Sequence, residues 1–374
     1  MARVSTPLLV RAAGQRDRCP GVLAPHPAAD GAMVRIRVPG GQTTGTALRA
    51  LGRVAQTYGS GLVQLTSRGS LQLRGLPSLP PRAVAEEVAA AGFLPSAAHE
   101  RVRNVAASPW SGLSNGDADL RPMVAALDDA LRAEPASADL PGRFLFVLDD
   151  GRGDARGLAL DLGYLALGPD RGWVLVGDDR HGLEVTAAEA VPTLIALAHR
   201  FLERRGHAWH VRELPGPLAA GLRTPPPSAA ADREPLGVVG EHLGVSVPLG
   251  LLGPAQLDVV ATVVGDGPLV VTPWRGLVLP GAASARAAVE RVGLVTDDDS
   301  AWTLVTACVG APWCANGRAD TRALAARLAG AGGPSAPTHL SGCERRCGAP
   351  ATAHRDLVAP GIDEIDALVG APRG

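Results

Sequence analysis

The 374-residue sequence predicts an α/β (α+β) protein built from two pseudo-repeated halves. Three observations support this fold class. A proline- and alanine-rich stretch divides the chain, the same order of elements occurs on both sides of it, and apolar residues alternate as they do in half-buried strands. Consecutive prolines favour extended geometry, which predicts a linker at 214–235. The predicted domains are 15–95 and 96–213 in the first half, and 236–298 and 299–374 in the second.

Both halves begin with the same succession of a strand, a helix, two strands and a second helix. In the first half we place these elements at 33–40, 44–58, 62–66, 71–73 and 81–91. In the second half the corresponding segments are 243–250, 254–264, 269–272, 277–279 and 283–292. Glycine follows the second helix in each half, at Gly92 and Gly293, where it is a common C-cap. Each half is therefore predicted to be a small unit of alternating strands and helices.

A further strand follows each unit and leads toward a predicted site, at 103–109 in the first half and 303–308 in the second. The first half then continues with two surface helices, at 122–132 and 187–204, and two strands, at 144–148 and 173–176. A weak helix at 362–368 is predicted near the C-terminus. The first half is thus expected to contain the larger second domain.

The charge balance excludes several classes of partner. The formal net charge of -1 and a pI near 6.8 give no overall attraction to nucleic acid or to an anionic membrane surface. No apolar run approaches the roughly 18 residues of a membrane span, and the N-terminal residues do not resemble a signal peptide. We therefore expect a cytoplasmic protein. All 36 basic residues are arginines, so every cationic contact is made by a guanidinium.

Four of the five cysteines fall into two clusters, Cys308-x5-Cys314 and Cys343-x3-Cys347. Four soft thiolates suit an iron–sulfur cluster, which predicts a redox protein. Structural zinc sites usually place two to four residues between paired cysteines, and no CxxC occurs, so zinc is the weaker interpretation. Disulfides and four unrelated buried cysteines are the remaining alternatives. The fifth cysteine, Cys19, follows a different pattern, beside Pro20 in a predicted turn.

These motifs resemble those of the nitrite and sulfite reductase superfamily. The segments 307–314 and 341–348 are similar to its two cluster motifs, and 65–75 is similar to its tetrapyrrole-side motif. The resemblance implies that each half contains a ferredoxin-like α/β half-domain followed by a reductase-type α/β domain. In the second half, this reductase-type domain is a short cluster-binding domain. It also implies a 4Fe-4S cluster on Cys308, Cys314, Cys343 and Cys347, next to a porphyrin-like ligand.

The flanking residues resemble, within that superfamily, the precorrin-3B synthases of aerobic cobalamin biosynthesis. They lie at 18–21, 30–31, 35–41, 272–276 and 339–343. The resemblance implies an oxidoreductase, a monooxygenase acting on a tetrapyrrole, which hydroxylates precorrin-3A at C20 and forms a γ-lactone. Its implied partners are dioxygen and an external, NADH-linked electron donor protein, with dioxygen activated at a mononuclear non-haem iron. Two alternatives remain: a sirohaem-dependent sulfite or nitrite reductase, and a non-catalytic tetrapyrrole or cluster carrier.

A ligand with eight carboxylates requires several fixed cations in its site. The candidates for substrate binding, expected to meet where the two halves join, are Arg68, Arg74, Arg103, Arg143 and Arg275. The alternative for each is a solvated surface arginine; Arg68 and Arg103 are the strongest candidates because each adjoins a predicted strand. The reductases carry a second basic residue two positions after the one that matches Arg143. Leu145 stands there in this chain, which favours hydroxylation of a large organic ligand over reduction of a small anion.

Several weaker candidates complete the prediction. Cys19 and His26 are candidate ligands of the lone iron, with a free buried cysteine and a surface histidine as the alternatives. His207 and His210 could share a helix face, and Asp161 is an acid in an apolar strand, either catalytic or simply buried and hydrogen-bonded. No phosphate loop or GxGxxG motif occurs, so reduced nicotinamide is not expected to bind this chain directly. Fewer residues follow Cys347 than in the family, which predicts a partly missing or differently supplied pocket wall.

Overall fold

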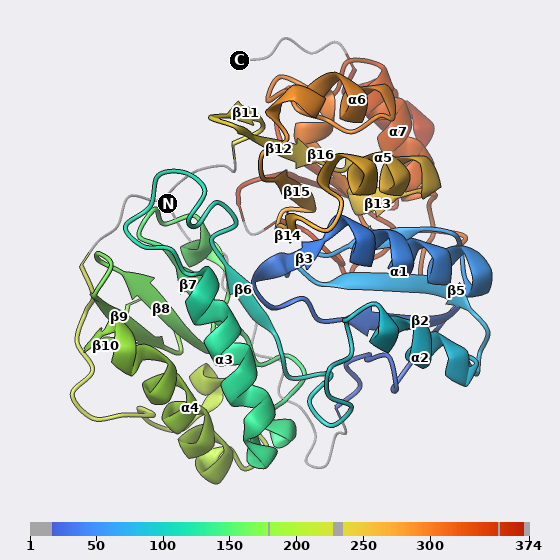
Figure 1. Ribbon diagram of the computed structural model, residues 1–374. Coiled ribbons are helices and arrows are strands. Elements are labelled where there is room, and N and C mark those ends of the chain that lie inside the picture. Colours follow the sequence, from blue (N-terminus) through green and yellow to red (C-terminus); the bar gives the residue numbers. More distant parts are fainter. Residues whose placement is uncertain (1–16, 179, 227–234, 351, 370–374) are drawn as a thin grey trace.

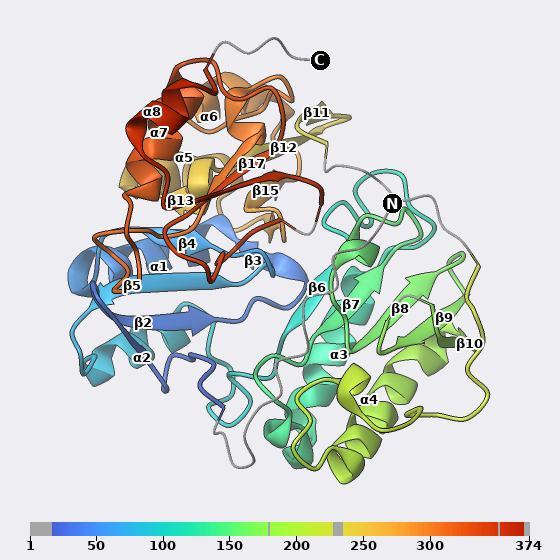
Figure 2. The ribbon, with the colours of Figure 1, turned by 180° about the vertical axis from the view of Figure 1, so that it is seen from behind.

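The computed structural model describes residues 17–178, 180–226, 235–350 and 352–369. In this part of the chain, two interlocked five-stranded sheets lie beside an α/β domain of the first half and a smaller α/β domain near the C-terminus (Figure 1; Figure 2 shows the reverse side). The mixture of helices and sheets confirms the predicted α/β (α+β) class. None of the helices described has both the length and the apolar character needed to cross a bilayer.

The first sheet contains four strands of the first half and one of the second, in the order β1-β2-β5-β4-β13. Its strands are β1 His26–Ala28, β2 Gly31–Ile36, β4 Val63–Leu65, β5 Leu71–Leu76 and β13 Leu251–Leu252. The helices of this unit are α1 (Gly45–Tyr58) and α2 (Arg82–Ala90). The predicted start of α1 is confirmed, because the Thr44 hydroxyl accepts a hydrogen bond from Ala47 N at 3.1 Å and so caps the helix.

The second sheet repeats this arrangement in the order β11-β12-β15-β14-β3. Its strands are β11 Gly237–Val239, β12 His242–Ser246, β15 Gly276–Leu279, β14 Pro268–Val271 and β3 Gln42–Thr44. The helix α5 (Pro254–Val264) has its predicted bounds. The helix α6 (Arg286–Arg291) is shorter than predicted, because the preceding turn at Ala283–Ala285 is a 3-10 helix.

Each sheet is completed by a strand of the other half. β13 pairs with β4, with Leu251 opposite Gln64, and β3 pairs with β14, with Thr43 opposite Leu269. The buried apolar residues of both sheets form one continuous core, and α1 lies against α5 (Figure 1). The predicted order of elements is confirmed in both halves. The two units are joined, because each half supplies an edge strand to the sheet of the other.

The α/β domain of the first half has the strand order β10-β9-β8-β7-β6, in which β6, β7 and β8 are parallel. Its strands are β6 Val105–Ala107, β7 Phe146–Asp149, β8 Leu162–Ala166, β9 Arg171–Val176 and β10 Gly182–Thr186. The helices α3 (Arg121–Ala133) and α4 (Ala187–Arg204) pack against it through apolar positions such as Leu127 and Leu194. The predicted surface helices are therefore buried along one side.

The first part of the predicted linker belongs to this α/β domain. Leu218 and Ala219 are only 1% and 8% exposed and lie in its core, and the backbone of Arg223 pairs with that of Gly182. The predicted linker therefore begins later than 214, because residues such as Leu218 pack into this core and Arg223 pairs with a strand. Residues 227–234 lie outside the described part of the chain.

The C-terminal domain contains a parallel sheet in the order β16-β17-β18. Its elements are β16 Val305–Ala307, α7 Thr321–Gly330, β17 Thr338–Ser341, β18 Arg355–Val358 and α8 Ile362–Asp366. The sequence predicted β16 and α8 but not the other three elements. Short 3-10 helices also occur at Pro39–Gly41, Pro135–Asp139, Ala155–Gly157, Val211–Glu213, Pro248–Gly250 and Ala301–Thr303.

Candidate functional site

The two cysteine motifs follow adjacent parallel strands. Cys308 comes directly after β16, and Cys343 lies two residues after β17. Because parallel strands end at the same edge of a sheet, both motifs begin at that edge. The register agrees, since Ala307 pairs with Leu340 and Cys308 N donates to Leu340 O at 2.9 Å. The sheet therefore brings together two motifs that are about 30 residues apart in sequence.

Glycines allow the two cysteine loops to approach each other closely. Gly342 N donates to Cys308 Sγ at 3.1 Å, a contact that links the two motifs. A β-carbon at Gly342 would lie 3.1 Å from the α-carbon of Gly317, so a larger residue would push the loops apart. Gly310 has a left-handed φ of 62°, a conformation that favours glycine.

The four clustered cysteines form one electrostatic group. Burial raises the pKa of Cys347, and the charges of Cys308, Cys343 and Cys314 raise it further, while Arg345 lowers it. All four thiols are free of disulfides. In the described residues, no three of these sulfurs lie within 4.8 Å of one another. A single tetrahedral zinc would hold its sulfurs about 3.8 Å apart. This rules out a closed zinc site in the present arrangement, and four soft donors are the ligand set that an iron–sulfur cluster requires.

A second group consists of four arginines, Arg35, Arg37, Arg68 and Arg143, which we call the arginine cluster. Burial lowers the pKa of Arg35 to about 10, and the charge of Arg68 contributes to that shift. Burial, followed by the charge of Arg35, lowers the pKa of Arg37 to about 9. Burial also lowers the pKa of Arg68, and the charge of Arg143 adds to this effect. The four guanidinium groups therefore repel one another in a partly desolvated place.

None of these four arginines forms an ion pair with a carboxylate of the described residues. Arg37 donates to the carbonyl oxygens of Pro20 at 3.2 Å and Gly142 at 3.3 Å, and its buried Nε has no partner there. Arg35 donates to the side-chain oxygen of Gln72 at 2.7 Å. Glu100 acts on Arg37 and Asp161 acts on Arg68 through their charges but without a salt bridge, so the cluster is suited to an anionic ligand.

Sequence reasoning did not include Arg35 and Arg37 among the site residues. Their spacing in the sequence could have identified them. Arg35 lies in β2 and Arg37 directly follows it, and both alternate with the buried residues Val34, Ile36 and Val38. Alternate residues of a strand face opposite sides, so this pattern places both charges on the side away from the apolar core.

The five predicted substrate-binding arginines do not meet at one place. Arg68 and Arg143 belong to the arginine cluster. Arg103 is bound to Asp128 on α3 by hydrogen bonds of 2.6 and 2.8 Å, and its side chain is 6% exposed. Arg74 is bound in the same bidentate manner to Asp30, at 2.8 and 2.9 Å. Their substrate contacts therefore stay predictions.

Arg74 and Arg275 also contact the cysteine loops. Arg74 donates to Trp313 O at 3.2 Å, next to Cys314, and Arg275 donates to Gly348 O at 2.8 Å, next to Cys347. Burial lowers the pKa of Arg275. Both arginines thus hold a cysteine loop against the paired sheets.

His26 links the cysteine centre to the arginine cluster. Burial lowers the pKa of His26, and the charges of Arg18, Arg345, Arg74 and Arg35 lower it further. Arg345 stands between Cys343 and Cys347, whereas Arg35 belongs to the arginine cluster. A histidine influenced by both shows that the two groups lie near each other.

A mononuclear metal site at Cys19 and His26 finds no support. Burial and the charge of Asp17 raise the pKa of the Cys19 thiol, and Arg143 opposes this shift. Across the residues that the structure describes, three ligand atoms within 4.8 Å of one another occur only in Asp149, Asp150 and Asp154, a group that includes neither residue. Arg152 forms an ion pair with Asp150 at 2.8 Å inside that acidic group.

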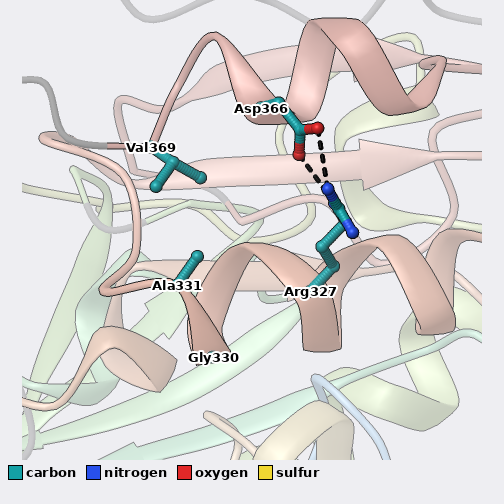
Figure 3. A pocket seen from close by; sticks show the side chains of 5 residues that line it. All are labelled: Arg327, Gly330, Ala331, Asp366 and Val369. Atoms are coloured by element: carbon teal, nitrogen blue, oxygen red, sulfur yellow. Dashed lines mark hydrogen bonds and ion pairs between the residues drawn. The ribbon is translucent and has the colours of Figure 1, made fainter.

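A hollow of the surface lies away from both groups. A shallow depression of about 510 Å³ separates α7 from α8, lined by Arg327, Gly330, Ala331, Asp366 and Val369 (Figure 3). Its two charged side chains, Arg327 and Asp366, are bound to each other at 2.6 and 2.8 Å. The depression therefore offers no unpaired charge to a ligand.

We expect Asp154 to make the stability of the protein depend on pH. Burial raises the pKa of Asp154 to about 7, with the charge of Asp149 contributing. The folded protein then keeps a proton that the unfolded chain releases near the ordinary aspartate pKa of 3.8, so this contribution to stability is full below that pH and is lost as the pH rises toward 7. At about 1.36 kcal/mol per unit, the loss is on the order of a few kcal/mol.

Urea unfolding of the Asp154→Asn variant at pH 5 and pH 8 tests this expectation. The variant should lose less stability across that range than the unmodified protein, because its side chain does not ionise. Asp170→Asn, at an exposed position, is the matched control and should keep the original pH dependence. An equally steep loss in Asp154→Asn would contradict the assignment.

Comparison with known proteins shows which proteins this chain resembles. A family model described as the nitrite/sulfite reductase ferredoxin-like half domain matches residues 25–90. A precorrin-3B synthase of Sinorhizobium sp is 27% identical over 376 residues, covering 92% of this chain and 81% of that protein. A ferredoxin–nitrite reductase of Synechococcus elongatus is 32% identical over 127 residues, covering 32% of this chain and 25% of that protein.

A solved structure extends the comparison to the fold. The NirA protein of Mycobacterium tuberculosis superposes with a TM-score of 0.67 and 19% identity, covering 85% of this chain and 69% of that one. This likeness confirms the predicted two-half architecture of the nitrite and sulfite reductases. Together with the sequence matches, it shows that the chain resembles a precorrin-3B synthase over most of its length and has a fold of the nitrite/sulfite reductase type.

Proposed function

We propose that the chain is a precorrin-3B synthase, an oxygen-dependent monooxygenase of aerobic cobalamin biosynthesis. In this proposal it hydroxylates precorrin-3A at C20 and forms a γ-lactone, with electrons from an external, NADH-linked donor protein. The observation that carries the proposal is the arginine cluster, four guanidinium groups that no described carboxylate neutralises, close to a centre of four cysteines. The similarity to a precorrin-3B synthase over 92% of the chain supports it.

The residues of the chain have separate tasks in this proposal. The arginine cluster binds the carboxylates of the macrocycle through charge-assisted hydrogen bonds and so orients it. Arg74 and Arg275 fix the two cysteine loops beside it. A 4Fe-4S cluster held by Cys308, Cys314, Cys343 and Cys347 would supply single electrons. For a mononuclear iron, the described residues of this region offer no group of three ligands.

The surroundings of Leu145 favour this reaction over reduction of a small anion. Leu145 is 3% exposed, packs in an apolar group with Val147 and Leu160, and donates its backbone N–H to Asp161 at 2.9 Å. The position therefore supplies no cationic proton donor to an anion bound beside Arg143.

Anaerobic purification followed by turnover tests the proposal. The protein should contain iron and acid-labile sulfide without a bound macrocycle. With precorrin-3A, a reduced donor and ¹⁸O₂, it should form a product that carries one labelled oxygen atom, the other oxygen atom leaving as water. A bound sirohaem with sulfite or nitrite reduction would replace this proposal with the reductase alternative. Binding of precorrin-3A without oxygen consumption would leave only a carrier.

A further inference from the structure

Asp161 and His210 form a buried pair that the proposed binding residues do not include. Asp161 is 0% exposed and precedes β8. Its carboxylate accepts hydrogen bonds from Leu145 N and Val211 N, both at 2.9 Å, and from His210 Nδ1 at 3.1 Å. Three donors, one of them an imidazole, thus compensate a fully buried acid. Such a pair is costly to bury, which suggests a role beyond packing.

The sequence singled out both residues but could not join them. The predicted helix face shared by His207 and His210 is wrong, because α4 ends at Arg204 and the chain then turns. His207 is exposed, whereas His210 is 6% exposed. The turn directs His210 to an acid that lies 49 residues earlier in the chain.

The hydrogen bond to Asp161 fixes the orientation of the His210 ring. Nδ1 is used by the carboxylate, and Nε2 makes no hydrogen bond to any residue that the structure describes. An imidazole held in this way by a buried carboxylate has one defined tautomer and one nitrogen available for proton transfer. The geometry is that of an oriented acid–base group.

The pair borders the arginine cluster. The guanidinium carbon of Arg143 lies 5.7 Å from the ring centroid of Trp209, the residue before His210. The charge of Asp161 raises the pKa of Arg68, and that of Arg212, two residues after His210, lowers it. The charged group in contact with His210 is Asp161, and the neighbouring residue Trp209 lies beside Arg143 and donates its backbone N–H to Glu213 at 2.7 Å.

We propose that His210 donates a proton during oxygen insertion at the arginine cluster, and that Asp161 is the residue that positions it. This inference rests on the proposed function. Oxygen insertion converts a C–H bond, dioxygen, two electrons and two protons into a C–OH group and water. The electrons come from the external donor. His210 gives one of the protons from Nε2 and becomes neutral, and solvent then returns a proton to the ring.

The variant His210→Asn tests this role. Its amide nitrogen can replace Nδ1 in the hydrogen bond to Asp161, but the group corresponding to Nε2 is removed. We expect the iron content and the anaerobic dissociation constant for precorrin-3A to stay within twofold of the unmodified protein. Turnover should fall by roughly 100-fold or more, and the pH–rate profile should change. His207→Asn is the matched control and should retain turnover and pH profile.

A second variant separates proton transfer from structural support. In His210→Ala, added imidazole should restore part of the lost turnover, which a purely structural defect would not allow. Unchanged turnover and pH profile in His210→Asn, or a loss of substrate affinity that accounts for the whole effect, would overturn the role of His210. A lack of ¹⁸O incorporation by the unmodified protein would instead overturn the proposed function, and the inference with it.

Discussion

Replacing Cys343 with serine should remove nearly all iron and acid-labile sulfide from the anaerobically purified protein. The four clustered cysteines influence one another electrostatically, so each is expected to provide one of the four ligands of a common centre. A hydroxyl is a much harder donor than a thiolate and does not hold such a cluster. We expect roughly four irons per chain in the unmodified protein and close to none in the variant. Metal analysis and the visible absorption spectrum measure the difference.

Cys19→Ser is the matched control for this experiment. Cys19 is the fifth cysteine, is buried, and does not contribute to the charges that act on Cys347. The control should therefore keep the full iron and sulfide content. Retention of both in Cys343→Ser would refute the cluster assignment, while loss of a single iron in Cys19→Ser would show that this cysteine binds a separate ion.

Arg68→Ala should weaken binding of precorrin-3A by roughly 10- to 150-fold, the range given by one hydrogen bond to a charged group. Arg68 is in the arginine cluster and has no carboxylate partner among the residues described, so its charge is available to the ligand. Binding should also weaken with salt, since the attraction is largely electrostatic. Anaerobic titration at two ionic strengths measures both effects.

The matched control is Arg82→Ala, because the Arg82 side chain is 91% exposed and pairs with Glu86 on α2. That variant should bind precorrin-3A as the unmodified protein does. Iron content should be the same in both variants, since neither residue touches a cysteine loop in a described contact. If Arg68→Ala kept full affinity, the arginine cluster would not be the substrate site.

Patterns of neighbouring residues predicted the helices and strands that depend only on the nearby sequence. The spacing of apolar residues placed α5 at its observed bounds, and Thr44 marked the start of α1. The strands β3 and β13 were missed because they contain three residues and two residues, too few for any periodicity, and their partners lie in the other half. The strand pairing that joins the halves is decided by tertiary structure.

In the candidate site, too, some features follow from the nearby sequence and others from tertiary structure. Cysteine spacing depends on the chain alone, so the sequence predicts a shared centre, and the sheet brings the two motifs to one edge. The sequence does not reveal whether an arginine forms an ion pair. Arg103 is paired with Asp128, whereas Arg68 has no such carboxylate partner among the described residues. The pairing of Asp161 with His210 was likewise hidden, because a turn after α4 creates it.

The exchange of the edge strands β3 and β13 between the halves bears on how the molecule arose and on how it can be divided into fragments. Two copies of a half-length ancestor could have covered their open sheet edges by donating one strand to each other, as a symmetric domain-swapped dimer does. Fusion into one polypeptide makes that association intramolecular, so it no longer depends on protein concentration. Fragments divided between the halves should therefore be insoluble when produced singly and recover the fold only when they are expressed together.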